Sequence, residues 1–343
     1  MKDITDSNSI RVMDNKENYL VCVRCTTYNH ANYIVDAMNG FVMQQTSFPY
    51  VCTIVDDAST DGEQVVVRKY LDDNFDLADT SVAYEKEEDF GHVVFARHKT
   101  NHHCYFAVIN LKENHYSRRQ SKLPYVQAWT DNSKYIAICE GDDYWTDPLK
   151  LQKQVGFLET HADFSMCFHS AEIVHEGVDE SKTGLKCQNL EDREYSSTEV
   201  FETWIVPTAS VIYRRELLNG YKLKHPEWLT RGDIGMVLKC AHKGKIFGMS
   251  DKMSVYRMQA NSVSHSSKFR DPEAFVLPNH FRCIYLNFPK VDKKPVVWNI
   301  SHAYYARMKR QKNVLLKFRD FFLFVYWDSQ YAIKKLFRVI KYS

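Results

Sequence analysis

Apolar residues follow two patterns along the first half of the chain, continuous runs and helical spacing. Short, continuous apolar runs at 19–25, 50–55 and 135–139 are typical of strands buried on both faces. Between the first two runs and after the second, apolar residues recur at helical spacing, as in 34–42 and 66–71. The order strand, helix, strand, helix predicts an α/β domain with a mainly parallel sheet and right-handed crossovers.

Each predicted strand ends in a polar turn. The first run leads into Thr-Thr-Tyr-Asn-His at 26–30, the second into Asp-Asp-Ala-Ser-Thr-Asp-Gly at 56–62, and the third into Glu-Gly-Asp-Asp at 140–143. Open α/β sheets bind ligands outside the carboxyl ends of their strands. The pattern therefore predicts that the three turns converge on one crevice.

The acidic turn carries the clearest chemistry, in Glu140, Asp142 and Asp143. Clustered carboxylates repel one another unless a proton or a cation joins them. Oxygen ligands suit Mg²⁺ or Mn²⁺, which can also hold a phosphate oxygen. Gly141 is expected to permit a sharp turn, and Asp147-Pro148 to open the next helix as N-cap and first helical residue. The plain alternative is a solvated turn that happens to be acidic.

The longer segment Glu-Gly-Asp-Asp-Tyr-Trp-Thr-Asp-Pro-Leu-Lys-Leu at 140–151 resembles the metal-binding motif of family 2 glycosyltransferases. These enzymes have the GT-A fold, a Rossmann-like domain with a mixed, mainly parallel sheet that binds a nucleotide sugar. The resemblance implies that Asp143 holds Mn²⁺ or Mg²⁺, with Asp142 or Glu140 nearby. P-loop ATPases also place Asp after an apolar strand, but the chain has no G-x-x-x-x-G-K-[ST] loop.

The first two turns resemble the nucleotide-binding motifs of the same family, through Thr-x-Tyr-Asn and Val-Asp-Asp-x-Ser-x-Asp-Gly. The likeness implies that Thr26, Tyr28 and Asn29 line the base pocket, with Tyr28 stacked on uracil. It implies that Asp57 accepts a hydrogen bond from the uracil N3–H, a donor that cytosine lacks. Asp142 is expected to contact the donor as well. Half-buried packing of Tyr28 remains the alternative.

A further helix is predicted to begin near Asp233, where an acid is ordinarily a cap. The family places its catalytic base at the start of this helix, so the resemblance implies that Asp233 is the base. Tyr256-Arg257 and Ser262-Val263-Ser264 follow where the family has a Tyr-Arg pair and serines. The resemblance covers about 19–265. It implies an inverting transfer of a hexosyl or N-acetylhexosaminyl group from a UDP-sugar to a glycan or a lipid-linked sugar, as in polysaccharide biosynthesis.

Two other classes of function remain open. A sugar-nucleotide nucleotidyltransferase also combines an α/β nucleotide fold with acidic metal ligands, but a glycine-rich phosphate loop is missing near 19–30. A non-catalytic relative that binds carbohydrate or membrane would have no need of intact acids at 140, 142, 143 and 233.

Composition adds the cellular setting. The 343 residues are 44% hydrophobic and 26% charged with a net charge of +2, which is ordinary for a globular protein. Nine scattered cysteines, an odd number, indicate reduced thiols in the cytoplasm. Cys22-x-x-Cys25 lies in a predicted strand, where residues three apart face opposite ways, so it is not expected to bind zinc. The polar residues 1–17 lack a signal-peptide core, and no stretch is apolar for the length of a membrane span.

We therefore expect a polar tail at 1–18, the catalytic domain at 19–268 and a helical extension at 269–343. Residues 307–343 contain ten Lys or Arg against two Asp and an apolar, aromatic run at 321–327. This combination suits a helix on an anionic membrane, which would place the enzyme at the inner face of the cytoplasmic membrane. It equally suits a terminal helix docked on the domain. No nucleic-acid-binding motif accompanies the charge, so we expect no nucleic-acid partner.

Overall fold

The computed structural model describes most of the chain, namely residues 19–176, 189–218, 220–259 and 267–341. The predicted tail at 1–18 and the Ser-Val-Ser motif at 262–264 lie outside the described residues.

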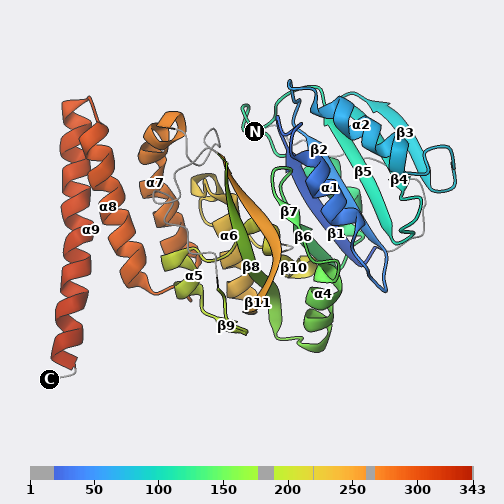
Figure 1. The fold of residues 1–343 in the computed structure, drawn as a ribbon. Helices are drawn as coiled ribbons and strands as arrows, with labels where there is room; N and C mark the ends of the chain where they lie inside the picture. Colours follow the sequence, from blue (N-terminus) through green and yellow to red (C-terminus); the bar gives the residue numbers. More distant parts are fainter. Residues whose placement is uncertain (1–18, 177–188, 219, 260–266, 342–343) are drawn as a thin grey trace.

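The elements follow one another in the predicted α/β order at the start and become mainly helical at the end (Figure 1). The strands are β1 (Val21–Thr27), β2 (Tyr50–Asp56), β3 (Ala83–Glu88), β4 (Gly91–Arg97), β5 (Cys104–Leu111), β6 (Tyr135–Ile138), β7 (Tyr144–Trp145), β8 (Phe164–Glu176), β9 (Arg193–Tyr195), β10 (Ile212–Arg214) and β11 (Lys245–Gln259). The α-helices are α1 (Ile34–Val42), α2 (Glu63–Asn74), α3 (Leu123–Asp131), α4 (Lys150–Thr160), α5 (Ser197–Thr203), α6 (Gly232–Lys243), α7 (Ser267–Asn287), α8 (Lys293–Arg310) and α9 (Val314–Lys341).

One mixed sheet runs through the domain in the order β3-β4-β5-β2-β1-β6-β10-β8-β11-β7, and β9 pairs with β11. The central strands β5, β2, β1 and β6 are parallel neighbours. Antiparallel pairs join β3 to β4 and β10 to β6 and β8. The predicted α/β class with a mixed sheet is therefore confirmed, and the parallel centre brings the carboxyl ends of β1, β2 and β6 to one edge.

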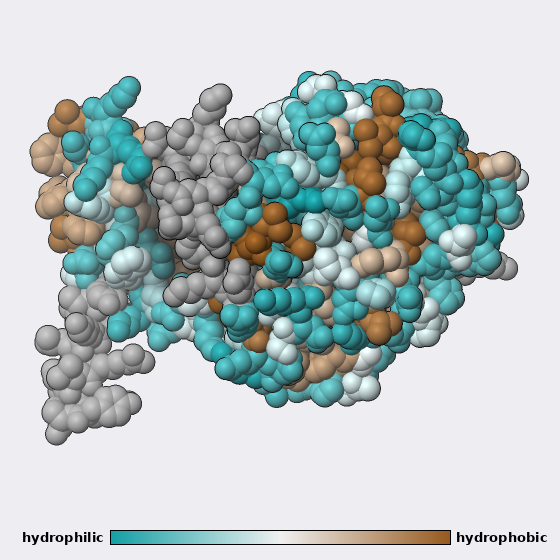
Figure 2. Space-filling model, viewed as in Figure 1, coloured by the Kyte–Doolittle hydropathy of each residue, from teal (hydrophilic) through white to brown (hydrophobic). Residues whose placement is uncertain are grey.

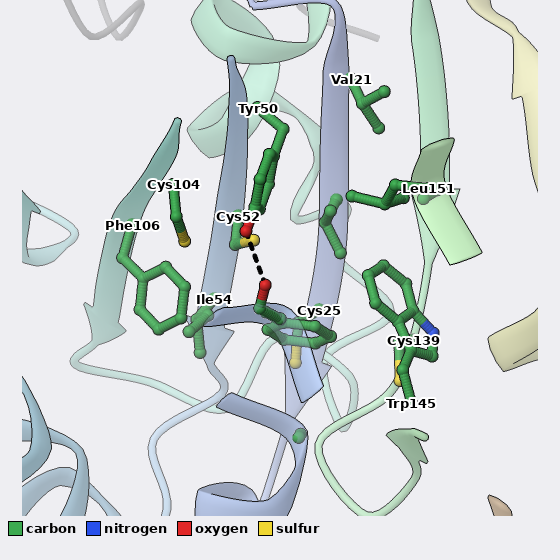
Figure 3. Packing of buried hydrophobic residues seen from close by; sticks show 14 of the residues in the cluster. Val21, Cys25, Tyr50, Cys52, Ile54, Cys104, Phe106, Cys139, Trp145 and Leu151 are labelled. Carbon is green, nitrogen blue, oxygen red and sulfur yellow. Dashed lines mark hydrogen bonds between the residues drawn. The ribbon is translucent and has the colours of Figure 1, made fainter. Parts of the chain in front are cut away.

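Apolar clusters cover both faces of the sheet. Every residue of β2 is buried, as its continuous apolar run predicted. In Figure 3, Tyr50 lies beside Cys52 in the cluster on one face, and its hydroxyl donates a 2.7 Å hydrogen bond to the Phe41 carbonyl. Cys25 belongs to this cluster and Cys22 to the cluster on the opposite face, which confirms that the two thiols point apart. The described cysteines are free and buried.

The C-terminal helices pack on the domain through a third apolar cluster, which confirms the predicted helical extension. Leu238 of α6 joins Ile284 of α7 and Ile300 of α8 in this cluster, with Trp327 of α9 packed against it. Figure 1 shows α8 and α9 side by side at the end of the molecule that is farthest from β3 and β4. Among the described residues, no helix combines the length and the apolar character that crossing a membrane requires.

α4 begins later than the sequence suggested. The prediction that Asp147 caps this helix with Pro148 as its first residue is wrong, because the N-cap is Leu149 and the helix starts at Lys150. Asp147 instead closes a local turn, in which its Oδ1 accepts a 2.7 Å hydrogen bond from the Leu149 N–H.

Candidate active site

The three polar turns meet at the carboxyl edge of the parallel strands. The Thr27 carbonyl at the end of β1 accepts a 3.0 Å hydrogen bond from the Asp57 N–H, which follows β2. On the other side, the Thr26 carbonyl accepts a 3.1 Å hydrogen bond from the Gly141 N–H, which follows β6. The predicted convergence is thus confirmed, and backbone hydrogen bonds hold the three turns together.

Gly141 is needed for a different reason from the sharp turn expected of it. A Cβ at this position would lie 2.2 Å from Thr27 Oγ1 and 2.6 Å from Thr27 Cβ. Only a residue without a side chain allows the acidic turn to approach the end of β1 so closely.

Asp143 is the most enclosed carboxylate of the acidic turn, with 1% of its surface exposed. Its Oδ1 accepts a 2.9 Å hydrogen bond from the Arg257 N–H of β11. Burial, followed by the negative charges of Asp142 and Glu140, raises the pKa of Asp143 well above its usual value. A cation bound beside Asp143 would therefore strongly favour its ionised form.

The negative charge of the acidic turn is not limited to Asp143. Burial, followed by the negative charges of Asp142 and Asp233, raises the pKa of Glu140 to about 7. Asp233 on α6 is therefore within electrostatic range of the acidic turn, although 92 positions separate residues 141 and 233 in the sequence. On the other side, Asp142 Oδ2 lies 3.8 Å from His30 Nε2, in the turn after β1.

The carboxylates of the acidic turn fit a hard divalent cation that takes some of its ligands from the protein and the others from a substrate. Among the described residues, no group of three or more His, Cys, Asp or Glu side chains is gathered closely enough to hold an ion alone. Mg²⁺ commonly takes one or two carboxylates together with substrate phosphates, and Mn²⁺ prefers oxygen ligands as well. Asp143 and Asp142 can supply the protein's share of such a site.

Asp57 has a structural role that sequence reasoning missed. Its buried carboxylate accepts hydrogen bonds from the N–H groups of His115 and Tyr116, at 2.7 and 3.0 Å, and from Lys122 Nζ at 2.9 Å. Burial alone would raise the pKa of Asp57, but the Lys122 ammonium and the two N–H donors outweigh it and hold this pKa below its usual value. Asp57 thus fixes the loop after β5. A carboxylate offers about four acceptor sites, so these three bonds do not exhaust Asp57, but only 1% of its surface is exposed and the bond to uracil stays a prediction.

The turn after β1 presents one aromatic ring to solvent. Tyr28 is 43% exposed, which leaves its ring accessible for the predicted stacking on a base. Asn29, in contrast, ties two turns together: its N–H donates to Ser59 Oγ at 2.8 Å and its Oδ1 accepts from the Thr60 N–H at 2.7 Å. Thr26 contributes through its backbone and is partly buried. The base-binding roles of these residues stay predictions.

Glu63 is a second residue that the sequence analysis missed. It is fully buried at the first position of α2 and accepts hydrogen bonds from the His30 N–H at 2.9 Å, from Ser59 Oγ at 2.8 Å and from Thr27 Oγ1. Burial raises the pKa of Glu63. The only signal in the sequence was an acid in the first turn of a predicted helix, which is common and points to no particular partner.

Asp233 lies in the first turn of α6 but does not cap it. The N-cap is Arg231, and no side-chain hydrogen bond closes this end of the helix. The cap interpretation of Asp233 is therefore wrong. Asp233 is partly exposed, and its role as the base stays a prediction.

Arg257 joins the acidic turn to three other parts of the domain. Besides the backbone bond to Asp143, its Nη1 donates to the Asp142 carbonyl at 2.9 Å, and its Nη2 bonds to Asp36 of α1. The guanidinium also lies 3.4 Å from Glu176 and 4.5 Å from the centre of the Tyr144 ring. The side chain positions the acidic turn without competing for the carboxylate of Asp143.

Arg257→Gln is expected to weaken metal-dependent nucleotide binding by about 10–100-fold, as is typical when a partner that orients metal ligands is lost. The Asp143 contact would survive, because it uses the backbone N–H. Arg257→Lys should be intermediate, since it keeps the charge but loses the planar fork. Calorimetric titration of UDP at several Mn²⁺ concentrations measures the effect. Wild-type affinity in Arg257→Gln would contradict this positioning role.

Comparison with known proteins places this site in context. No family model matches the chain. It is 30% identical over 241 residues to the uncharacterized protein Rv1520 of Mycobacterium tuberculosis, and the match covers 70% of this chain and 59% of that protein. The chain thus spans about three fifths of the length of its mycobacterial relatives. It is 26% identical over 255 residues to TuaG of Bacillus subtilis, a putative teichuronic acid biosynthesis glycosyltransferase, covering 73% of this chain and 83% of TuaG.

Among solved structures, residues 1–349 of S. aureus TarS in complex with UDP-GlcNAc align with a TM-score of 0.53 at 17% identity, over 84% of this chain and 72% of that one. This likeness confirms the predicted GT-A fold. The predicted resemblance to family 2 glycosyltransferases is confirmed by the fold together with relatives that carry the name glycosyltransferase, TuaG and alr2836 of Nostoc.

Proposed function

We propose that this protein is a metal-dependent, inverting glycosyltransferase that moves a sugar from a UDP-sugar to a hydroxyl of a glycan or a lipid-linked sugar. The observation that carries the proposal is the convergence of the three polar turns at the carboxyl ends of β1, β2 and β6, where backbone hydrogen bonds hold the acidic turn beside the end of β1. The charge of Asp233 on α6, the candidate base, also acts on Glu140 of that turn. The complex of TarS with UDP-GlcNAc and the name of TuaG support a UDP-sugar donor and a surface-glycan acceptor.

In this mechanism Asp143, with Asp142 or Glu140 beside it, holds Mn²⁺ or Mg²⁺. When bound, the ion supplies positive charge that stabilises the diphosphate of the leaving UDP. Tyr28 stacks on the uracil, and the remaining acceptor site of Asp57 receives the uracil N3–H.

Asp233 takes the proton from the acceptor hydroxyl as its oxygen attacks the anomeric carbon. The new carbon–oxygen bond forms on the face opposite UDP while the bond to the diphosphate oxygen breaks, so the anomeric configuration inverts.

A panel of UDP-sugars, with matched GDP-sugars as controls, tests the proposal. We expect UDP release from one or a few UDP-sugars in the presence of Mn²⁺ and little release after chelation. NMR of the product should show inversion at the anomeric carbon, and retention would contradict the single-displacement mechanism.

The same assay separates the other classes. Pyrophosphate formed from UTP and a sugar 1-phosphate would favour a nucleotidyltransferase. UDP-sugar binding without release or transfer, across the panel and with glycan and lipid-linked acceptors, would favour a non-catalytic relative.

A further inference from the structure

The terminal helix α9 is docked on the protein through one of its faces. Leu323, Phe324 and Trp327 pack against the third apolar cluster, and the Trp327 ring lies 5.6 Å from the Tyr285 ring of α7. Asp320 is fully buried and is bonded by the guanidinium of Arg307 on α8, at 2.7 and 2.9 Å. These contacts fix which side of α9 faces the protein and which side faces outward.

The outward side of α9 is also apolar. Apart from Leu316, which is 37% exposed on another side of the helix, its exposed apolar residues are Val314, Leu315, Phe318, Phe321, Phe322, Val325 and Tyr326. At about 100° of rotation per residue, these positions fill one continuous arc of roughly 140° on the helix. Leu315 is 79% and Phe322 67% exposed. Figure 2 shows apolar side chains gathered on the edge of the molecule that α9 forms. Contiguous exposed apolar surface of this kind marks an interaction site.

Positive charge borders this apolar arc. By the same rotation Lys317 and Arg319 fall on its two sides, and Lys309, Arg310 and Lys312 are exposed just before the helix. Two acids reduce this charge in part. The buried Asp320 accepts a 3.1 Å hydrogen bond from Arg319 besides those from Arg307, and the exposed Asp328 falls on the Lys317 side of the arc. The exposed bases still outnumber the exposed acid. The sequence adds four more Lys or Arg at 334, 335, 338 and 341.

We propose that the outward face of α9 lies on an anionic lipid bilayer, with its apolar arc inserted at the level of the headgroups and its basic borders on the lipid phosphates. An amphipathic helix with basic residues beside aromatic ones binds anionic membranes in this orientation. A second copy of the chain is a poorer occupant, because it would set like charges against each other. The proposal does not depend on the transferase function, although a lipid-linked acceptor would agree with it.

Flotation of the full-length protein with lipid vesicles tests this surface, because only vesicle-bound protein rises in the gradient. Phe318→Ser/Phe322→Ser removes two rings from the outward face, and Val65→Ser is the matched control, since Val65 is 74% exposed on α2. With vesicles of phosphatidylglycerol and phosphatidylcholine, the wild type and Val65→Ser should float. The double variant should bind about tenfold more weakly or worse, because it loses apolar area that would be inserted.

Salt should weaken binding of the wild type without abolishing it, because the apolar contribution is not screened. Failure of the wild type to float, or equal flotation of the double variant, would overturn the proposal. A dimer of the wild type in analytical ultracentrifugation that the double variant abolishes would assign the surface to a second copy and overturn it too. UDP release by the double variant with a soluble acceptor is expected to match the wild type, which keeps this test separate from that of the transferase function.

Discussion

Asp143→Asn is expected to abolish turnover and to weaken metal-dependent UDP binding by about 100-fold or more, since it removes a direct ligand rather than a partner of one. The substituted amide has the same shape and can keep its oxygen on the Arg257 N–H. What it loses is the negative charge, which is the property that a divalent cation requires. Calorimetric titration of UDP with and without Mn²⁺ measures this loss, with Asp73→Asn on the exposed face of α2 as the control.

The thermal stability of this variant gives an independent check. Because the pKa of Asp143 is raised in the folded protein, ionising it there costs more than ionising it in the unfolded chain. The wild type without metal should therefore lose stability as the pH rises from the unfolded pKa of this group toward its raised folded pKa. Asp143→Asn should escape that loss and melt at the same or a higher temperature in metal-free buffer at neutral pH. If folded Asp143→Asn kept its metal-dependent affinity for UDP, Asp143 would not be a metal ligand.

Asp233→Asn is expected to keep UDP-sugar binding and to lose about 10²–10⁴-fold in the rate of transfer, the usual contribution of a general base. Because no side-chain hydrogen bond of Asp233 caps α6, the substitution should leave the melting temperature nearly unchanged. Single-turnover transfer to the acceptor, together with the Kd for the donor, separates chemistry from binding.

A transfer rate close to that of the wild type in Asp233→Asn would assign the base elsewhere. Glu140 is then the first alternative, because a pKa raised to about 7 lies near the operating pH of a general base. Glu140→Gln would distinguish the two, since it should affect metal and donor binding in the proposed mechanism but proton removal in the alternative.

The sequence was sufficient to predict those parts of the fold and the site that depend on local patterns of apolar and polar residues. Continuous apolar runs identified β1, β2 and β6, and the parallel pairing that they imply brought Asp57, Asp142 and the turn after β1 together. The acids at 140–143 were visible because their turn follows such a run directly. The position of Asp233 near them could be predicted only through the resemblance to a family.

The missed features depend on contacts between distant segments. The guanidinium of Arg257 reaches a carbonyl 115 residues earlier, and Lys122 reaches a carboxylate 65 residues earlier. No spacing or composition in the sequence indicates that Arg257 or Lys122 would make these contacts. The sequence presented docking and membrane contact of the last helix as alternatives. The structure instead docks one apolar face of α9 on α7 and α8 and leaves a second apolar face exposed, which the sequence could not distinguish.

The third apolar cluster limits where a chimera of two related proteins can be joined. Ile234 and Leu238, one and five residues after Asp233, pack into the same core as Trp327 of α9. A chimera joined at residue 268, where the sequence suggested a boundary, would therefore cut through this core and leave α6 without its apolar partners. Val237 and Cys240 of the same helix pack on the sheet through the second apolar cluster. α6 therefore ties the terminal helices to the sheet, and a graft should keep α6 together with both of its partners.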